Sequence, residues 1–197
     1  MGTRGVFGFQ VGNQLKVTYN HFSSDPGGLG EEVLSFCKHH DLDTMKKMAS
    51  AIELVDSDVA PTHEQIVRCR EAGTIDLGVS EQSETDWYCL LRDAQGDLNK
   101  VTEVGIMIDS QSFLSDSLFC EWAYIINLDN STLEVYSGFN EKPAVGRFEK
   151  SPPNDGGYYP VTLIATLDLT KEVMGGTLHQ ALDILGVLEK EEEEEEE

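Results

Sequence analysis

The stretch that most constrains the fold is a predicted β-hairpin near the start of the chain. Residues 4–11 alternate side chains in the two-residue period of a strand, and residues 14–21 do the same. Gly12-Asn13 between them is typical of a two-residue hairpin turn. A turn this short fixes the register, so we expect Arg4 to pair with His21 at the open end of the hairpin.

The first of these strands contains Gly5 and Gly8. Glycine weakens a strand because it has no side chain to pack and loses much conformational freedom. We therefore expect another backbone or a ligand to approach the strand closely at these two positions.

The rest of the chain mixes helical and strand patterns with no internal repeat, which predicts an α+β fold: a mostly antiparallel sheet started by the N-terminal β-hairpin and covered by several helices. We expect a single domain over residues 1–188, with a long surface loop at 138–160, and a disordered poly-Glu tail at 189–197. Predicted helices cover about 30–40, 43–54, 62–72, 83–94 and 176–188, and predicted strands cover about 100–108, 120–128, 132–136 and 161–169.

The net charge of −22 limits the partners of this chain. Residues 189–197 contain eight Glu and one Lys, so they carry −7, and residues 1–188 carry −15. Such a body repels nucleic acid and anionic membranes, and we expect it to bind neither directly. The charge is compatible with a basic protein partner, a cationic ligand, imitation of nucleic acid, or solubility alone.

Four widely spaced cysteines and the absence of a secretory or membrane-spanning pattern predict reduced thiols in a cytoplasmic protein. Cys37, His40, His63 and Cys69 are the residues that come closest to a metal-binding set, but their spacing fits no standard zinc pattern. We therefore expect no metal and no cofactor.

Polar side chains collect at the open end of the predicted hairpin, where Arg4 faces the run Tyr19-Asn20-His21. Asp25 follows within a turn, and Gly28 and Gly30 enter the next helix. A glycine-rich helix entry presents backbone N–H groups that attract anions. The alternative is a strand end capped by polar residues, with the glycines serving only the turns.

The opening residues carry a family resemblance. The sequence Met-Gly-Thr-Arg-Gly at 1–5, Tyr-Asn-His at 19–21 and Gly-Leu-Gly at 28–30 resembles uncharacterised proteins of phage and microbial genomes. A looser similarity is to N-terminal nucleophile hydrolases, which open with Cys, Ser or Thr and a hairpin. That similarity implies Thr3 as the nucleophile and its freed amine as the base, with Asn20 matching the family's asparagine. The Arg before that asparagine and the Asp after it are missing here.

Two functions follow as expectations. The first is a soluble protein that binds a small anionic ligand, nucleotide-like or an acyl-amide, through Arg4, Tyr19, Asn20, His21, Asp25, Gly28 and Gly30, with hydrolysis by Thr3 left open. The second is a non-catalytic acidic interaction protein or inhibitor that imitates nucleic acid, such as a viral anti-defence protein, and docks on a basic protein. The oligomeric state is left open.

Overall fold

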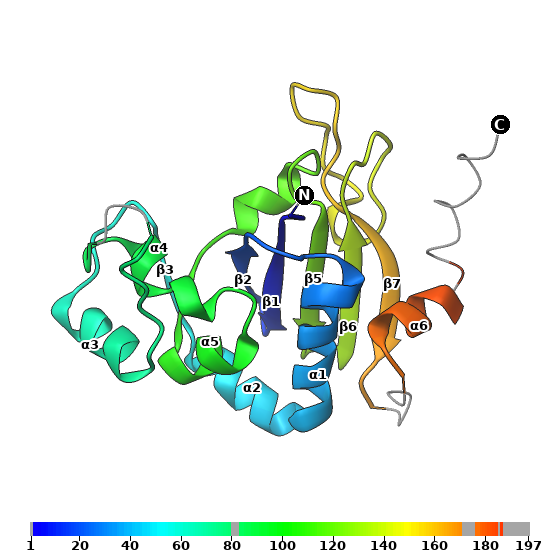
Figure 1. Cartoon of the computed structure of the whole chain (residues 1–197). Helices are drawn as coiled ribbons and strands as arrows, with labels where there is room; N and C mark the ends of the chain where they lie inside the picture. The colour runs from blue at the N-terminus through cyan, green and yellow to red at the C-terminus, as the bar shows by residue number, and fades with distance from the viewer. Residues whose placement is uncertain (1, 80–82, 171–175, 185, 187–197) are drawn as a thin grey trace.

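A computed structural model describes residues 2–79, 83–170, 176–184 and 186 of the chain (Figure 1). The predicted poly-Glu tail lies outside these residues. The fold is α+β, as predicted, and its centre is a mixed sheet of five strands in the order β2-β1-β5-β6-β7. Only β1 and β5 run parallel, and the other neighbours are antiparallel. The strands are β1 (Gly5–Val11), β2 (Gln14–Asn20), β5 (Trp122–Asn127), β6 (Thr132–Ser137) and β7 (Thr162–Asp168).

The N-terminal hairpin has the register that the turn predicts. Val11 pairs with Gln14 and Gly5 with Asn20, so continuing the same register brings Arg4 opposite His21. The close approach expected at Gly8 is also confirmed, because a Cβ at Gly8 would collide with the Lys16 carbonyl oxygen of β2. Gly8 has φ +155°, a conformation that other residues rarely adopt.

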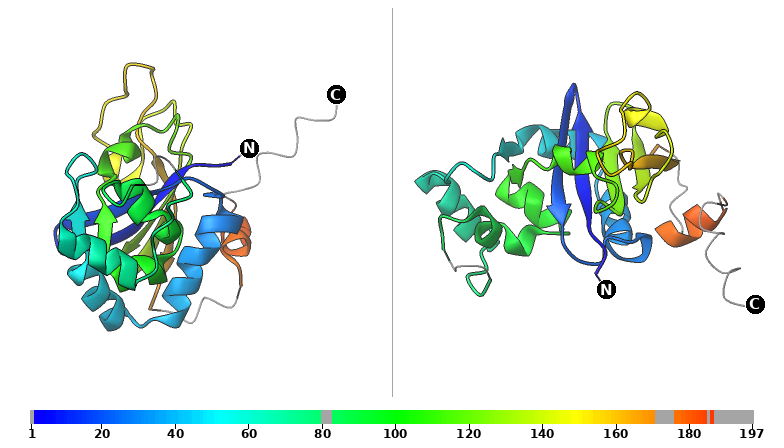
Figure 2. Two further views of the ribbon diagram at one scale, coloured as in Figure 1. Left: turned by 60° about the vertical axis from the view of Figure 1, so that its left-hand side comes forward. Right: turned by 90° about the horizontal axis from the view of Figure 1, so that it is seen from above.

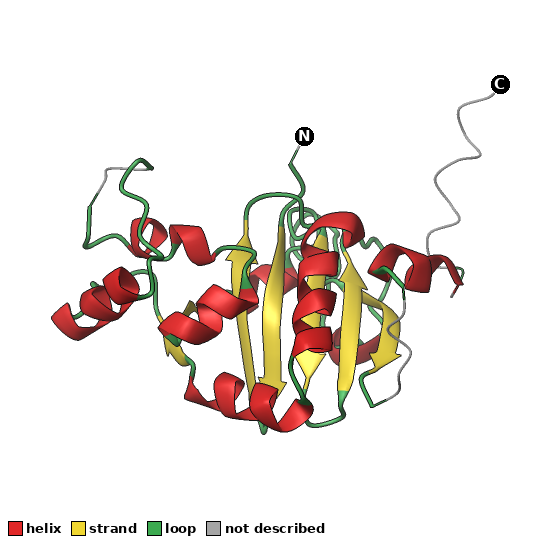
Figure 3. Ribbon diagram, turned by 60° about the horizontal axis from the view of Figure 1, so that its bottom comes forward, coloured by secondary structure: helices red, strands yellow, loops and turns green. Residues whose placement is uncertain are grey.

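Four helices cover one face of the sheet, and α1 lies in front of the strands and runs along them (Figure 3). They pack on Phe7, Phe9, Tyr124 and Ile126 from the two central strands, and these four side chains are fully buried. This is the largest core of the described residues. The four helices are α1 (Glu31–His39), α2 (Leu42–Ala51), α5 (Leu98–Val104) and α6 (Leu178–Ile184).

The opposite face of the sheet is covered by the short turns η3 (Gln111–Ser115) and η4 (Gly146–Phe148) and by the long loop predicted at 138–160. Glu134 fastens that loop to the sheet, because its carboxylate accepts hydrogen bonds from Arg147 at 3.0 Å and from Tyr136 at 2.5 Å. The sheet is therefore a middle layer with both faces covered.

A smaller lobe projects beside β2 and contains the parallel strands β3 (Glu53–Val55) and β4 (Ile106–Ile108), the helices α3 (His63–Glu71) and α4 (Trp87–Leu90), and the turn η2 (Arg92–Ala94). Figure 2 shows this lobe standing apart from the hairpin on the side opposite α6. It has a separate core that includes Cys69, Trp87, Leu90 and Ile106. The Thr62 capping box predicted at the start of α3 is present.

Three sequence predictions in this region were wrong. The strand predicted at 100–108 is the helix α5 followed by β4, because Asp97 caps the helix and Gly105 ends it in the left-handed conformation. The helix predicted to 54 ends at Ala51, so that 53–55 can pair with β4. The helix predicted from Ser83 or Thr85 begins only at Trp87, where Asp86 accepts a hydrogen bond from the Tyr88 N–H.

Lys16 connects the hairpin to the helical layer. Its side chain is 4 % exposed, and Nζ donates hydrogen bonds to the carbonyl oxygens of Ala49, Ser50 and Ile52 at 3.0, 3.2 and 2.6 Å. Ala49 and Ser50 belong to the last turn of α2, where carbonyl groups lack the usual N–H partner four residues on, and Ile52 is the C-cap residue. The ammonium group also complements the negative end of the α2 dipole.

Replacing Lys16 with Met should lower the free energy of unfolding by about 1.5–3 kcal/mol, because charge-assisted hydrogen bonds are lost and the carbonyl groups are left without this donor. Chemical denaturation of Lys16→Met measures the loss. The exposed Lys47→Met on the same helix is the control. Equal stability of the two variants would show that the Lys16 contacts contribute nothing.

Candidate functional site

The open end of the hairpin gathers the predicted residues on two sides of the sheet. Arg4 lies with its guanidinium carbon 5.0 Å from the ring centre of Phe119, and Tyr19 Oη lies 2.9 Å from His21 Nδ1. Arg4 thus contacts Phe119, whereas His21 contacts Tyr19. Arg4 and His21 are neighbours through the backbone register alone, and among the described residues no side-chain hydrogen bond joins them.

Asn20 projects to the face of the strand opposite Tyr19, as the alternation predicts. It is 4 % exposed, and its Nδ2 donates to Ser24 Oγ at 2.9 Å and to the carbonyl oxygen of Phe22. Its Oδ1 lies close to Gly96, where an added Cβ would be only 3.1 Å away. Asn20 thus fixes the turn after β2 and connects it to the segment that follows η2.

Thr3 and Asp25 are joined by two hydrogen bonds of opposite direction. Its hydroxyl group donates to Asp25 Oδ2 at 3.4 Å and accepts from the Asp25 N–H at 3.2 Å. These bonds attach the start of the chain to the glycine-rich turn. The role of Thr3 as a nucleophile stays a prediction.

The glycine-rich turn forms a single π-helical turn, η1 (Pro26–Gly30), directly before α1. Asp25 Oδ1 accepts from the N–H groups of Gly27 and Gly28, each at 3.1 Å. The Leu29 N–H donates to the Ser23 carbonyl oxygen and the Gly30 N–H to that of Asp25. The N–H groups that were expected to bind an anion already have partners. The carboxylate of Asp25 occupies the position that an anionic ligand would take.

A cavity of about 550 Å³ lies beside this turn, and we call it the Arg92 cavity. Its walls come from the end of the hairpin, from η1 and the first turn of α1, and from the segment at η2. Of the residues that the sequence pointed to, Asn20 and Gly28 line it, whereas Thr3, Arg4, Tyr19, His21, Asp25 and Gly30 do not. The lining residues are Asn20, Phe22, Ser23, Gly27, Gly28, Leu29, Glu31, Glu32, Asp76, Arg92, Asp93, Gln95 and Gly96.

The charged residues of the Arg92 cavity are four carboxylates and one guanidinium group. Glu31 Oε1 accepts hydrogen bonds from the N–H groups that begin α6, and Asp76 Oδ1 accepts from the Gly78 N–H. Glu32 and Asp93 are exposed, and their carboxylates make no side-chain hydrogen bond or ion pair with any described residue. The cavity therefore has an excess of negative charge, which disfavours an anionic ligand.

Arg92 is held in place by two rings and one hydrogen bond. Its guanidinium carbon lies 5.0 Å from the ring centre of Phe22 and 5.3 Å from that of Tyr88. Its Nη1 donates to Gln95 Oε1 at 2.8 Å. Phe22 remains 55 % exposed, so much of its ring is open to solvent at the wall of the cavity. No sequence motif marks Arg92: Tyr88 and Gln95 are local neighbours, but Phe22, which connects it to the end of the hairpin, lies far from it along the chain.

Within the described residues, no group of three or more His, Cys, Asp or Glu side chains is arranged to hold a metal ion. The thiols are also poorly suited to ligation or nucleophilic attack. Burial raises the pKa of Cys37 from 9.0 to about 12, and it raises the pKa values of Cys69 and Cys120 as well. These cysteines are protonated near neutral pH.

No family model matches the chain, and no curated protein or solved structure matches it at a significant level. Among the helices of the described segments, none has both the length and the apolar character needed to cross a bilayer. The function must therefore be argued from the geometry of the site.

Replacing Asp25 with Ala should lower the free energy of unfolding by about 1–2 kcal/mol, the usual effect of removing a side-chain cap, because the Gly27 and Gly28 N–H groups lose their acceptor. Urea denaturation provides the measurement. The exposed Asp58→Ala controls for the loss of one negative charge. No difference between these two variants would mean that the carboxylate does not hold the turn.

The stability that Cys37 contributes should depend on pH. Because its folded-state pKa is raised, this contribution is fully present below about pH 9 and is lost as the pH rises towards 12. Between these values the wild type should lose stability relative to Cys37→Ala, by at most about 1.4 kcal/mol per pH unit. Parallel denaturation curves at several alkaline pH values test this, and a constant difference between the two proteins would contradict it.

Proposed function

We propose that this protein binds a small organic cation, an amine, in the Arg92 cavity. The observation that carries the proposal is the charge of the cavity: the carboxylates of Glu32 and Asp93 have no described partner, and two further carboxylates share the wall with a single guanidinium group. The volume of about 550 Å³ is within the usual range for small-molecule sites.

A cation gains from this arrangement in two ways. The charge of −15 on residues 1–188 attracts positive ligands over a distance, and the carboxylates of the wall attract them on contact. The guanidinium group of Arg92 offers hydrogen-bond donors to an oxygen of the same ligand, since among the described residues only Gln95 accepts a hydrogen bond from it.

The proposal changes the ligand that the sequence suggested. An anion at the glycine-rich turn would compete with Asp25, which already binds the N–H groups there. An amine requires no such displacement. Docking on a basic protein, the second expectation from the sequence, rests on the net charge alone and stays a prediction, as does hydrolysis.

Calorimetric titration with butylamine, butanol and butyrate tests the proposal, because these probes share a chain and differ in charge. Butylamine should bind, butyrate should not, and binding should weaken as salt is raised. Glu32→Gln and Asp93→Asn should each weaken butylamine binding by about twofold to fivefold, the effect of one exposed charge.

Glu103→Gln is the matched control, because Glu103 is exposed on α5 and does not line the cavity. It removes the same charge from the whole protein without changing the site. Equal weakening by Glu103→Gln and Glu32→Gln would show that the effect comes from net charge and would reject the cavity as the binding site. Tighter binding of butyrate than of butylamine would also reject the proposal.

A further inference from the structure

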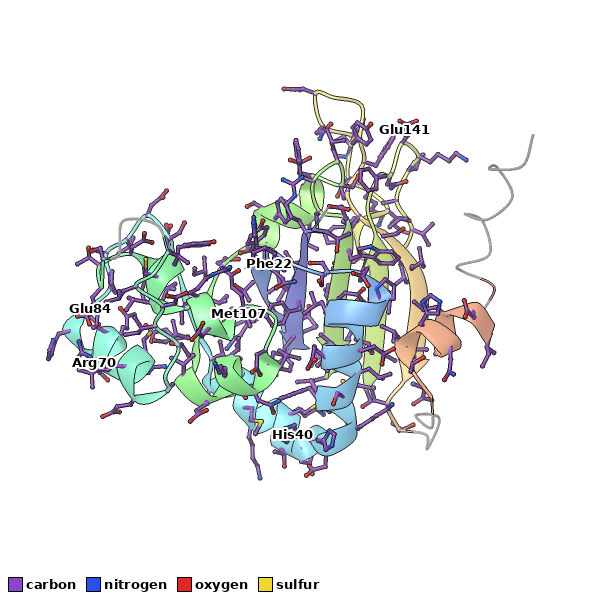
Figure 4. All side chains as sticks on the ribbon, viewed as in Figure 1. Phe22, His40, Arg70, Glu84, Met107 and Glu141 are labelled. Carbon is purple, nitrogen blue, oxygen red and sulfur yellow. The ribbon has the colours of Figure 1, made fainter. Side chains whose placement is uncertain are left out.

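A second cavity, which we call the Tyr88 cavity, lies between the main sheet and the smaller lobe. Its volume is about 240 Å³, and β2, α4, α5 and β4 all contribute to its wall. Neither the sequence analysis nor the function proposed above uses it. Figure 4 labels Met107, which lines this cavity from β4, and Phe22, which lines the Arg92 cavity.

The lining of the Tyr88 cavity is mainly apolar and aromatic. Trp87 and Tyr88 supply rings, and Val101, Ile106 and Met107 supply aliphatic surface. Asp86 is the one charged residue among the described lining residues, and its Oδ1 already accepts from the Tyr88 N–H. Such a wall favours an uncharged ring, and an apolar cavity of roughly 150 Å³ is known to hold benzene in another protein.

The two cavities meet at η2. Gln95 lines both of them, and Tyr19 and Asn20 are consecutive residues that line one cavity each. The guanidinium group of Arg92 contacts a ring from each side, Phe22 of the first cavity and Tyr88 of the second. The Arg92–Gln95 pair therefore stands between two neighbouring cavities, and a ligand that occupies both needs a linker that passes this pair.

We infer that the ligand is an arylalkylamine, whose ammonium group lies among the carboxylates of the Arg92 cavity and whose aromatic ring enters the Tyr88 cavity. This inference rests on the proposed function for the position of the amine. To that function it adds an aromatic ring on the ligand, and it places this ring on the Tyr88 side of η2. Tyr19, whose Oη lies 2.9 Å from His21 Nδ1, lines the second cavity and gives the ring a polar neighbour.

The test compares butylamine with benzylamine, phenethylamine and phenylbutylamine, which differ in linker length. At least one of the three should bind about tenfold more tightly than butylamine, from burial of the ring. Trp87 reports its arrival directly: the chain has two tryptophans, so Trp122→Phe leaves Trp87 as the single tryptophan, which can be excited selectively over the tyrosines. Its emission should change with the aromatic amines and not with butylamine.

Ala94→Leu fills part of the Tyr88 cavity and should remove the gain from the ring while leaving butylamine binding unchanged. If that variant does not fold, Val101→Leu, which adds a single methylene group at the same wall, takes its place. Butylamine binding with no gain from any ring would overturn this inference and leave the proposed function standing. Failure of every amine to bind would overturn both.

Discussion

The close pairing of β1 with β2 is the constraint on which the rest of the structure depends. At Gly8 the strands approach so closely that a side chain would meet the Lys16 carbonyl oxygen, and the short turn leaves no freedom of register. This pairing sends Lys16 to the end of α2, where it bonds three carbonyl groups, and places Asn20 at the start of the glycine-rich turn. The position of the Arg92 cavity follows from the same register.

The parts of the fold that follow local rules were predictable. The register of the hairpin, the capping box at Thr62 and the strand around Tyr124 all follow from short-range patterns that the structure confirms. The stretch at 98–108 was assigned wrongly because its valines and isoleucines favour a strand, although Leu98, Val101 and Val104 recur every three residues, as on one face of a helix. In that stretch Asp97 caps a helix and Gly105 ends it, and these two residues determine that 98–104 is helical.

The candidate site was predictable only in part. The sequence pointed to the end of the hairpin, and Asn20 and Gly28 do line a cavity there. It could not show that Asp25 would bind the glycine N–H groups, because that depends on the conformation of one turn. Nor could it show Arg92 and Asp93, which no motif marks and which reach the hairpin only because α5 and η2 pack beside it. The expected ligand therefore changed from an anion to a cation.

The central claim is that a protonated amine binds between η1, the first turn of α1 and η2, where negative charge exceeds positive charge. Amide chemical-shift mapping during titration with butylamine tests it most directly, because each backbone N–H reports separately. The account predicts shifts concentrated at Gly28, Glu32, Asp93 and Gly96, which saturate together and diminish in Asp93→Asn. Shifts spread evenly over the acidic surface, or concentrated on α3, would contradict it.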